Sequence, residues 1–107
     1  MTKLDDILKL ANLLDDGPSG TQHPFGPGQK VIIRTVTHYY TGQVESIDDH
    51  WIALSDAAWI ADTGRWAQAL ANGTLSEIEP YPNGCWIAGG SVVDVAPWDY
   101  ALPRDSK

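Results

Sequence analysis

The 107-residue sequence predicts a mainly β protein, in which an N-terminal α-helix precedes a small barrel, which is favoured over a sandwich. The first observation is an apolar stripe at helical spacing near the N-terminus. The second is a change of period after residue 28, where short runs rich in Val, Ile, Thr and Tyr alternate with turn residues. The third is size, because a strand region of about 75 residues is small for two full sheets. The chain 1–107 is therefore predicted to be one domain.

Residues 1–16 are predicted to form the helix, and residues 17–28 a linker. The apolar stripe of the helix consists of Leu4, Ile7, Leu8, Ala11 and Leu14. Seven of the twelve linker residues are Gly or Pro, so the helix is expected to end at Gly17-Pro18. Since a helix of this length is marginal alone, we expect its stripe to dock on another surface.

The barrel is predicted to span residues 29–97. Its strand candidates share an enrichment in β-branched and aromatic residues and are bounded by turn signals. They are 30–40 (one strand, or two with a tight turn), 43–47, 51–55, 85–88 and 91–96. A further stretch, 57–61, follows an expected kink at Asp56.

An insert over residues 62–84 breaks the strand rhythm. Within it, 65–71 is predicted to form two helical turns and 75–78 a short strand, before a strong turn signal at 80–84. The tail 98–107 is expected to be irregular or frayed at its end.

The charge distribution limits the possible partners. Seven Lys and Arg residues face fourteen Asp and Glu, so the formal net charge is -7. Between Thr35 and Pro103 the only basic residue is Arg65, against nine acidic ones. A broad phosphate-binding surface needs clustered Lys and Arg, and this pattern argues against one.

Cys85 is the only cysteine, which excludes an internal disulfide and a cysteine-based zinc cluster. The sequence has no nucleophile elbow and no phosphate-binding loop, so we expect no catalytic residue, no metal and no cofactor. The N-terminal stretch is unlike a signal peptide, and no apolar run approaches the roughly 20 residues that cross a bilayer. These features predict a soluble, cytoplasmic protein with no membrane partner.

Two segments carry a family resemblance, residues 42–54 (GQVESIDDHWIAL) and residues 85–96 (CWIAGGSVVDVA). They resemble the signatures of Sm-like proteins, most closely those of the bacterial Hfq branch. In residues 42–54 a Gly opens the segment, apolar residues alternate, and an Asp occupies the turn before the next strand. Residues 85–96 are similar to the second signature, a short apolar strand, a small turn and a final apolar strand. The resemblance implies a strongly bent, five-stranded antiparallel barrel of the SH3-like or Sm-like type, here with an insert.

The same resemblance implies a homo-oligomeric ring of about five to eight copies, in which edge strands of neighbouring subunits pair. The physical logic is general, because an exposed edge strand is a liability unless it is paired. The implied subunit contacts are Trp86, Ile87, Val92 and Val93.

Sm-like proteins hold RNA at the turn after the second strand and at the turn before the last one. Here the second turn is Gly89-Gly90, without the Arg-Gly or Lys-His that the family usually has. The implied contacts for weak binding of single-stranded RNA near the pore are Asp48, His50, Tyr39, Tyr40, Gly89 and Gly90. Aromatic residues on strands stack on bases in many RNA-binding sheets, but Tyr39 and Tyr40 can equally pack across strands.

Two of these features have competing interpretations. Asp48-Asp49-His50 can be a metal or acid–base site, or a solvated hairpin turn in which Asp is simply favoured. Cys85 can be a nucleophile assisted by His38 or His50, or a small buried apolar residue.

The five tryptophans also have two interpretations, a ligand pocket or core plus subunit interface. On the second interpretation, Trp51 and Trp59 belong to the barrel, Trp86 to the subunit contact and Trp66 to the insert, while Trp98 has no assignment.

The sequence thus predicts a non-enzymatic, ring-forming Sm-like scaffold or binding module that binds single-stranded RNA weakly. The alternative is an acidic interaction platform that repels nucleic acid and recruits a basic protein partner. A small enzyme is the third hypothesis, and it requires a polar group from the insert beside Asp48 and His50.

Overall fold

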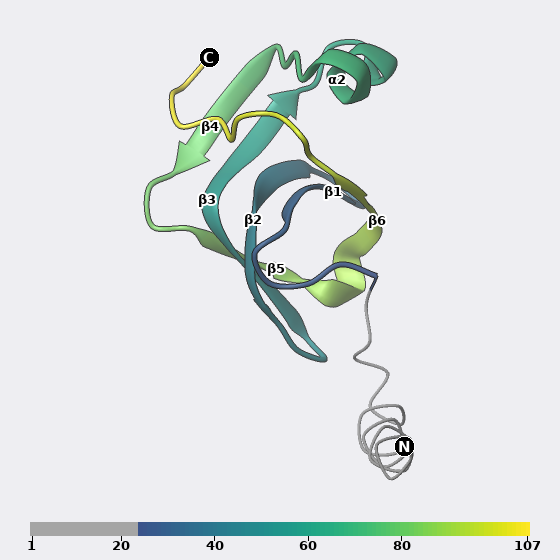
Figure 1. Ribbon diagram of the computed structural model, residues 1–107, viewed down its shortest axis with the longest axis vertical. Coiled ribbons are helices and arrows are strands. Elements are labelled where there is room, and N and C mark those ends of the chain that lie inside the picture. The colour runs from purple at the N-terminus through teal and green to yellow at the C-terminus, as the bar shows by residue number, and fades with distance from the viewer. Residues whose placement is uncertain (1–23) are drawn as a thin grey trace, which may run out of the picture.

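The computed structural model describes residues 24–107, so the expected helix 1–16 and most of the linker lie outside the described residues. The described part is built from strands, with one short helix and one 3-10 turn (Figure 1). The strands are β1 (Lys30–Thr35), β2 (Tyr39–Ile47), β3 (Trp51–Asp62), β4 (Glu77–Tyr81), β5 (Cys85–Ala88) and β6 (Val92–Pro97). The helical elements are α2 (Trp66–Asn72) and η2 (Gly89–Ser91). No helix within residues 24–107 has the length and hydrophobicity that a membrane crossing requires.

All the strands belong to one antiparallel sheet with the order β4-β3-β2-β1-β6, and β5 also pairs with β3. The first half of the long strand β3 pairs with β5, as in Leu54 opposite Cys85, and its second half pairs with β4, as in Ala57 opposite Tyr81. β4 and β5 therefore follow one another along the same side of β3. If β4 and β5 are counted as one bent strand, the sheet has the five strands that the resemblance predicts.

The pairing of β4 corrects the predicted insert. Residues 77–81 are a barrel strand, although the sequence places them inside an insert that runs to residue 84 and assigns Pro80 and Tyr81 to a turn. The turn is shorter, and only the segment with α2 separates β3 from β4. The reason is that Pro80 lacks an N–H but still fits an edge strand, whose outer side needs no donor.

The sharp bend of β3 occurs at Asp56, where the sequence predicts a kink. Asp56 has a positive φ of 47°, and it lies between the residues that pair with β5 and those that pair with β4. In the turn between β4 and β5, Gly84 has a φ of 78°. An added Cβ at Gly84 would lie 2.5 Å from the carbonyl oxygen of Leu54, so only glycine fits at this close approach.

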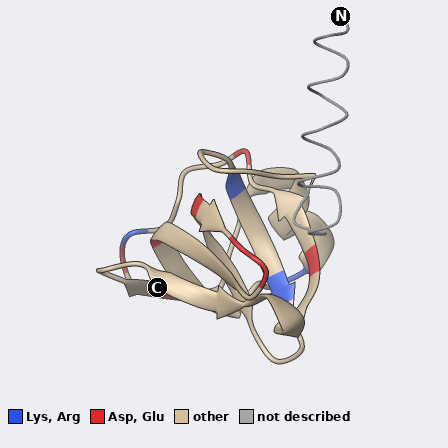
Figure 2. Ribbon diagram, turned by 90° about the horizontal axis from the view of Figure 1, so that it is seen from below, with Lys and Arg blue, Asp and Glu red and all other residues tan. Residues whose placement is uncertain are grey.

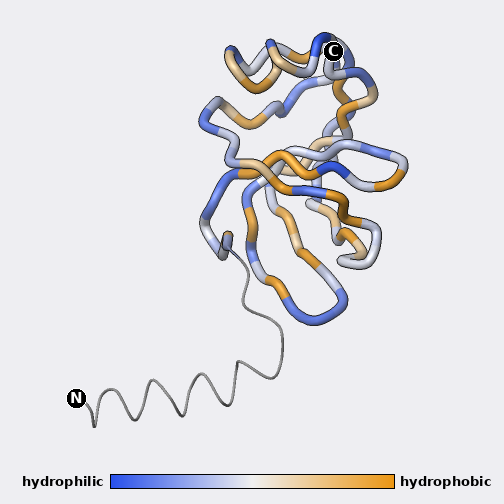
Figure 3. The backbone as a smooth tube through the Cα atoms, turned by 90° about the vertical axis from the view of Figure 1, so that its right-hand side faces the viewer, coloured by the Kyte–Doolittle hydropathy of each residue, from blue (hydrophilic) through white to orange (hydrophobic). Residues whose placement is uncertain are grey.

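The first core lies on one face of the sheet. It consists of the buried residues Val31, Ile33, Val44, Ile52, Leu54, Ala57 and Ile87. Successive residues of a strand point to opposite faces, which explains why Ile32 belongs to a second core although both its neighbours belong to the first. This double burial accounts for the unbroken apolar run at the centre of β1 (Figure 3).

The second core lies on the opposite face, where α2 and the C-terminal segment cover the sheet (Figure 1). Its buried members are Ile32, Ala58, Ile60, Ala69, Leu75, Ile78 and Trp98. Helix α2 agrees with the predicted helical turns to within one residue. It ends at Gly73, which has a φ of 74° and donates its N–H to the carbonyl oxygen of Ala69 over 2.8 Å.

The C-terminal segment is irregular, as predicted, but its end is not frayed. Trp98 is 2% exposed, and its indole N–H donates to the carbonyl oxygen of Ala101 over 3.2 Å. At the end of the chain, Lys107 and Ile78 exchange two backbone hydrogen bonds of 2.9 and 3.0 Å. The segment is held because Trp98 buries a large apolar area that the isolated sequence does not reveal.

Candidate functional site

The hairpin that joins β2 to β3 is held by the carboxylate of Asp48. One carboxylate oxygen, Oδ1, accepts the backbone N–H of His50 and that of Trp51, both over 2.7 Å. These two bonds favour the charged form and lower the pKa of Asp48. Asp48 is thus a turn residue, as one of its two interpretations predicts. Within residues 24–107 no group of three His, Cys, Asp or Glu side chains could hold a metal ion.

The two turns that the resemblance assigns to RNA lie side by side. The backbone N–H of Gly89 donates to the carbonyl oxygen of His50 over 2.7 Å, which joins η2 to the β2–β3 hairpin. His50 and Gly90 are exposed, and a side chain at Gly90 would meet nothing within 4 Å. Neither turn has a Lys or Arg, and basic residues are sparse along the described ribbon (Figure 2). Asp48, His50, Gly89 and Gly90 therefore form one surface at this end of the barrel.

Tyr39 and Tyr40 are not part of that surface, since they begin β2 and the hairpin follows the end of the same strand. They also face opposite sides of the sheet. The ring of Tyr39 lies 5.2 Å from that of Trp66 on α2, and the ring of Tyr40 lies 6.3 Å from that of Tyr81 on β4. Burial is the largest cause that raises the pKa of Tyr40. Both tyrosines pack between elements, which is the second of the two interpretations drawn from the sequence.

Cys85 has the environment of a packing residue. Its side chain is half-buried against the first core, and this burial raises the pKa of the thiol to about 11. A nucleophilic cysteine needs a stabilised thiolate, and burial has the opposite effect. The structure therefore supports the apolar interpretation of Cys85.

The predicted subunit contacts differ in exposure. Trp86 on β5 and Val93 on β6 are 77% and 56% exposed, and Val92 is half-buried against the first core. Ile87 is only 4% exposed and is a member of the first core, so its side chain packs inside its own chain, and its part in a subunit contact stays a prediction. The physical reason is strand alternation, which turns Ile87 inward when Trp86 points outward.

Of the tryptophans assigned to the barrel, Trp59 is half-buried but Trp51 is 49% exposed. Trp51 lies on the outer face of the sheet, on the side opposite to the buried Ile52, so it belongs to a barrel strand but not to the core. It stands close to Trp86, because Trp51 pairs with Ala88 and Ala53 pairs with Trp86. The period-two alternation around Ile52 is the sequence signal that would have placed Trp51 outside.

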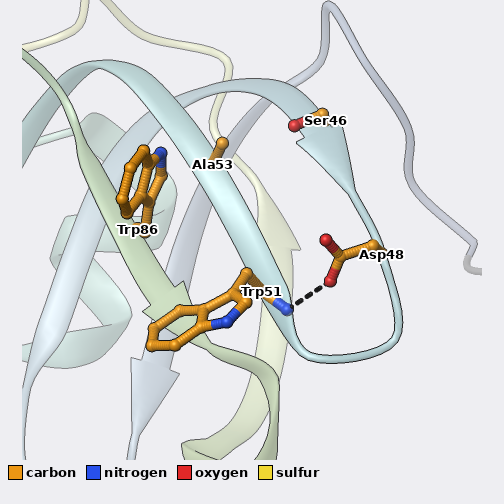
Figure 4. Close-up of a pocket in the computed structure, with 5 residues that line it drawn as sticks. All are labelled: Ser46, Asp48, Trp51, Ala53 and Trp86. Carbon is orange, nitrogen blue, oxygen red and sulfur yellow. Dashed lines mark hydrogen bonds between the residues drawn. The ribbon is translucent and has the colours of Figure 1, made fainter.

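A hollow of about 430 Å³ lies on this outer face (Figure 4). Its lining residues are Ser46, Asp48, Trp51, Ala53 and Trp86. Ser46, Ala53 and Trp86 are register partners across β2, β3 and β5, so two small side chains form the floor beside the large indole. No local sequence pattern predicts this hollow, because its lining comes from three separate strands.

Two edges of the sheet are free in the described chain. β5 pairs on one side with β3, and β6 pairs on one side with β1, while neither pairs with the other. The backbone groups on the outer side of each strand thus have no strand partner within residues 24–107.

By sequence, the chain matches no protein-family model and no curated protein. By structure, it is similar to a heptameric archaeal Sm protein, with a TM-score of 0.50 and 20% identity over 82% of this chain and 97% of that one. It is also similar to the SmAP1 heptamer of P. aerophilum, with a TM-score of 0.52 and 20% identity over 84% of this chain and 92% of that one. The bent five-stranded sheet and these likenesses define a small antiparallel β-barrel protein. More narrowly, the chain has the Sm-like fold, as the resemblance of its two segments predicts.

Proposed function

We propose that this protein is a non-enzymatic scaffold whose chains pair edge to edge into a closed ring. The observation that supports the proposal most directly is the pair of free edges on β5 and β6, which lie on different parts of the bent sheet. Pairing β5 of one copy with β6 of the next would extend the sheet and would satisfy both edges. Such a head-to-tail contact closes when the rotation between copies permits it. The two similar structures are themselves described as heptamers.

Side-chain exposure supports the same contact. Trp86 and Val93 are large apolar residues that stand out from β5 and β6, the two strands with free edges. Exposed apolar residues grouped in this way are typical of protein interfaces. In the proposed ring Trp86, Val92 and Val93 would lie along the subunit boundary, with Val92 anchored in its own first core.

Light scattering at micromolar concentration tests the ring. The expected mass is about five to eight times that of one chain. Val93→Asp places a charge at the proposed contact and is expected to lower the mass. Leu70→Asp is the control, because Leu70 is 38% exposed and lies on α2, which has neither of the two free edges. A monomeric wild-type protein, or equal effects of the two variants, would count against the ring.

A second candidate function is weak binding of single-stranded RNA at the joined turns. The hydrogen bond from Gly89 to His50 supports it, because it brings the two turns of the resemblance to one surface. The exposed His50 ring is the group available to stack on a base. Because neither turn has a basic residue, the affinity is expected to be weak and to fall steeply with salt.

Titration of labelled U-rich and A-rich oligonucleotides at low salt tests this candidate. Binding that His50→Ala reduces, and that His38→Ala on the β1–β2 connection does not, would support the turn surface. Absence of binding at tens of micromolar would exclude it. The acidic surface would then favour the alternative, an interaction platform for a basic protein.

A further inference from the structure

The hollow on the outer face of β2, β3 and β5 is walled by two exposed indoles. Trp86 is 77% exposed and Trp51 is 49% exposed, whereas Trp98 elsewhere in the chain is 2% exposed. Neither Trp51 nor Trp86 makes a ring contact or an indole N–H hydrogen bond within residues 24–107. Both rings are thus free to contact a ligand, and the small side chains of Ser46 and Ala53 line the same hollow (Figure 4).

The surroundings of the hollow are acidic. Asp48 lines it, Asp49 follows in the same exposed turn, and the exposed Glu45 precedes Ser46 on the strand that forms part of the floor. No Lys or Arg occurs between Arg34 and Arg65 in the sequence, and Arg34 is already paired with Asp94. The local charge therefore favours a cationic ligand and disfavours one that brings phosphate groups.

We infer that this hollow is a docking site for a basic peptide, whose arginine side chain inserts between Trp51 and Trp86. A guanidinium group is planar and weakly hydrated, and it stacks on the face of an indole through cation–π attraction. Trp is the strongest aromatic partner for such contacts. The aliphatic part of the arginine would cover Ala53, and the acidic hairpin would attract the remaining basic residues of the peptide.

The site does not depend on the proposed ring. Strand pairing uses backbone groups in the plane of the sheet, whereas the side chains of Trp51 and Trp86 stand out from that plane. Trp51 is on β3, which has partners on both sides and is not an edge strand. Edge-to-edge assembly through β5 thus brings the next subunit beside Trp86 at the boundary, while Trp51, Ala53 and Ser46 on the outer face of the hollow stay open.

Calorimetric titration with a short Gly-Ser peptide that has a central arginine and flanking lysines tests the inference. Replacing the central arginine by glutamine keeps the flanking charges and is expected to weaken binding about tenfold. Trp51→Ala and Trp86→Ala are each expected to weaken binding of the arginine peptide by a similar factor. Val36→Ala removes an exposed apolar side chain away from the hollow, so it is the control and should leave binding unchanged.

The outcomes separate this inference from the ring. Light scattering on each variant reports the assembly state, and Trp51→Ala weakens peptide binding without a change of mass if the inference holds. Absence of binding to the wild-type protein, or equal binding of the arginine and glutamine peptides, would overturn it. The inference would also be overturned if a U-rich oligonucleotide displaced the peptide from the wild-type protein and bound Trp51→Ala more weakly than the wild type. The hollow would then hold a base.

Discussion

Gly84 and Leu54 approach so closely that no side chain fits between them. A Cβ on Gly84 would lie 2.5 Å from the carbonyl oxygen of Leu54, and the φ of Gly84 is 78°. This contact lies between the segments of β3 that pair with β4 and with β5. The bend that shapes the sheet therefore depends on a glycine at this position.

We predict that Gly84→Ala lowers the free energy of unfolding by about 1–3 kcal/mol from the positive φ alone, with a further loss from the clash. Gly90→Ala is the matched control, because a Cβ there meets nothing within 4 Å, and we expect a change below about 0.5 kcal/mol. Urea unfolding monitored by circular dichroism measures both. Equal losses in the two variants would contradict the role of the close approach.

Trp98 is predicted to anchor the C-terminal segment on the second core. Since it is 2% exposed, Trp98→Ala should lower the free energy of unfolding by about 3–5 kcal/mol. The same substitution at Trp86, which is 77% exposed, should cost less than about 1 kcal/mol at equal protein concentration. Chemical denaturation of the two variants gives the comparison, and a small effect at Trp98 would show that the segment does not need its indole.

The Asp48 carboxylate makes stability depend on pH in a defined direction. Its pKa is lowered in the folded state by the N–H groups of His50 and Trp51, so its stabilising effect is complete above its ordinary value of 3.8. The effect is lost as the pH falls below that value through the folded-state pKa. We predict that the wild type unfolds at higher urea than Asp48→Asn at about pH 7, and that the difference shrinks on acidification below 3.8.

Asp49→Asn is the control for this experiment. The carboxylate of Asp49 makes no hydrogen bond or ion pair within residues 24–107, although it is the next residue of the same turn. A pH-dependent difference for Asp49→Asn as large as that for Asp48→Asn would contradict the assignment.

Cys85 should react slowly with thiol reagents in the folded protein. Burial raises the pKa of its thiol from 9.0 to about 11, which at about pH 8 reduces the reactive thiolate roughly one hundredfold. The rate with a disulfide reagent should therefore rise strongly when the protein is unfolded in guanidinium. A fast reaction in the folded state would revive the hypothesis of a nucleophilic cysteine.

The candidate sites were partly predictable. The two turns at Asp48–His50 and Gly89-Gly90 were identified from local turn residues and from the resemblance, and the Gly89–His50 hydrogen bond joins them. The hollow beside Trp51 and Trp86 has no local sequence signal, because tryptophans are equally typical of cores and interfaces. Strand alternation beside Ile52 would have turned Trp51 outward, but only the register across β3 and β5 brings it near Trp86.

By itself, the sequence determined most of the elements and the Sm-like class of the fold. The β-branched runs of β1 to β3, the kink at Asp56 and the helical turns of α2 are local signals, set by residues within a few positions of one another. Tertiary structure alone decided that β4 belongs to the barrel, that Ile87 faces inward and that Trp98 of the C-terminal segment is buried in the second core. Those outcomes depend on pairing and burial between segments far apart in the chain, and no local pattern encodes which distant surface a side chain will meet.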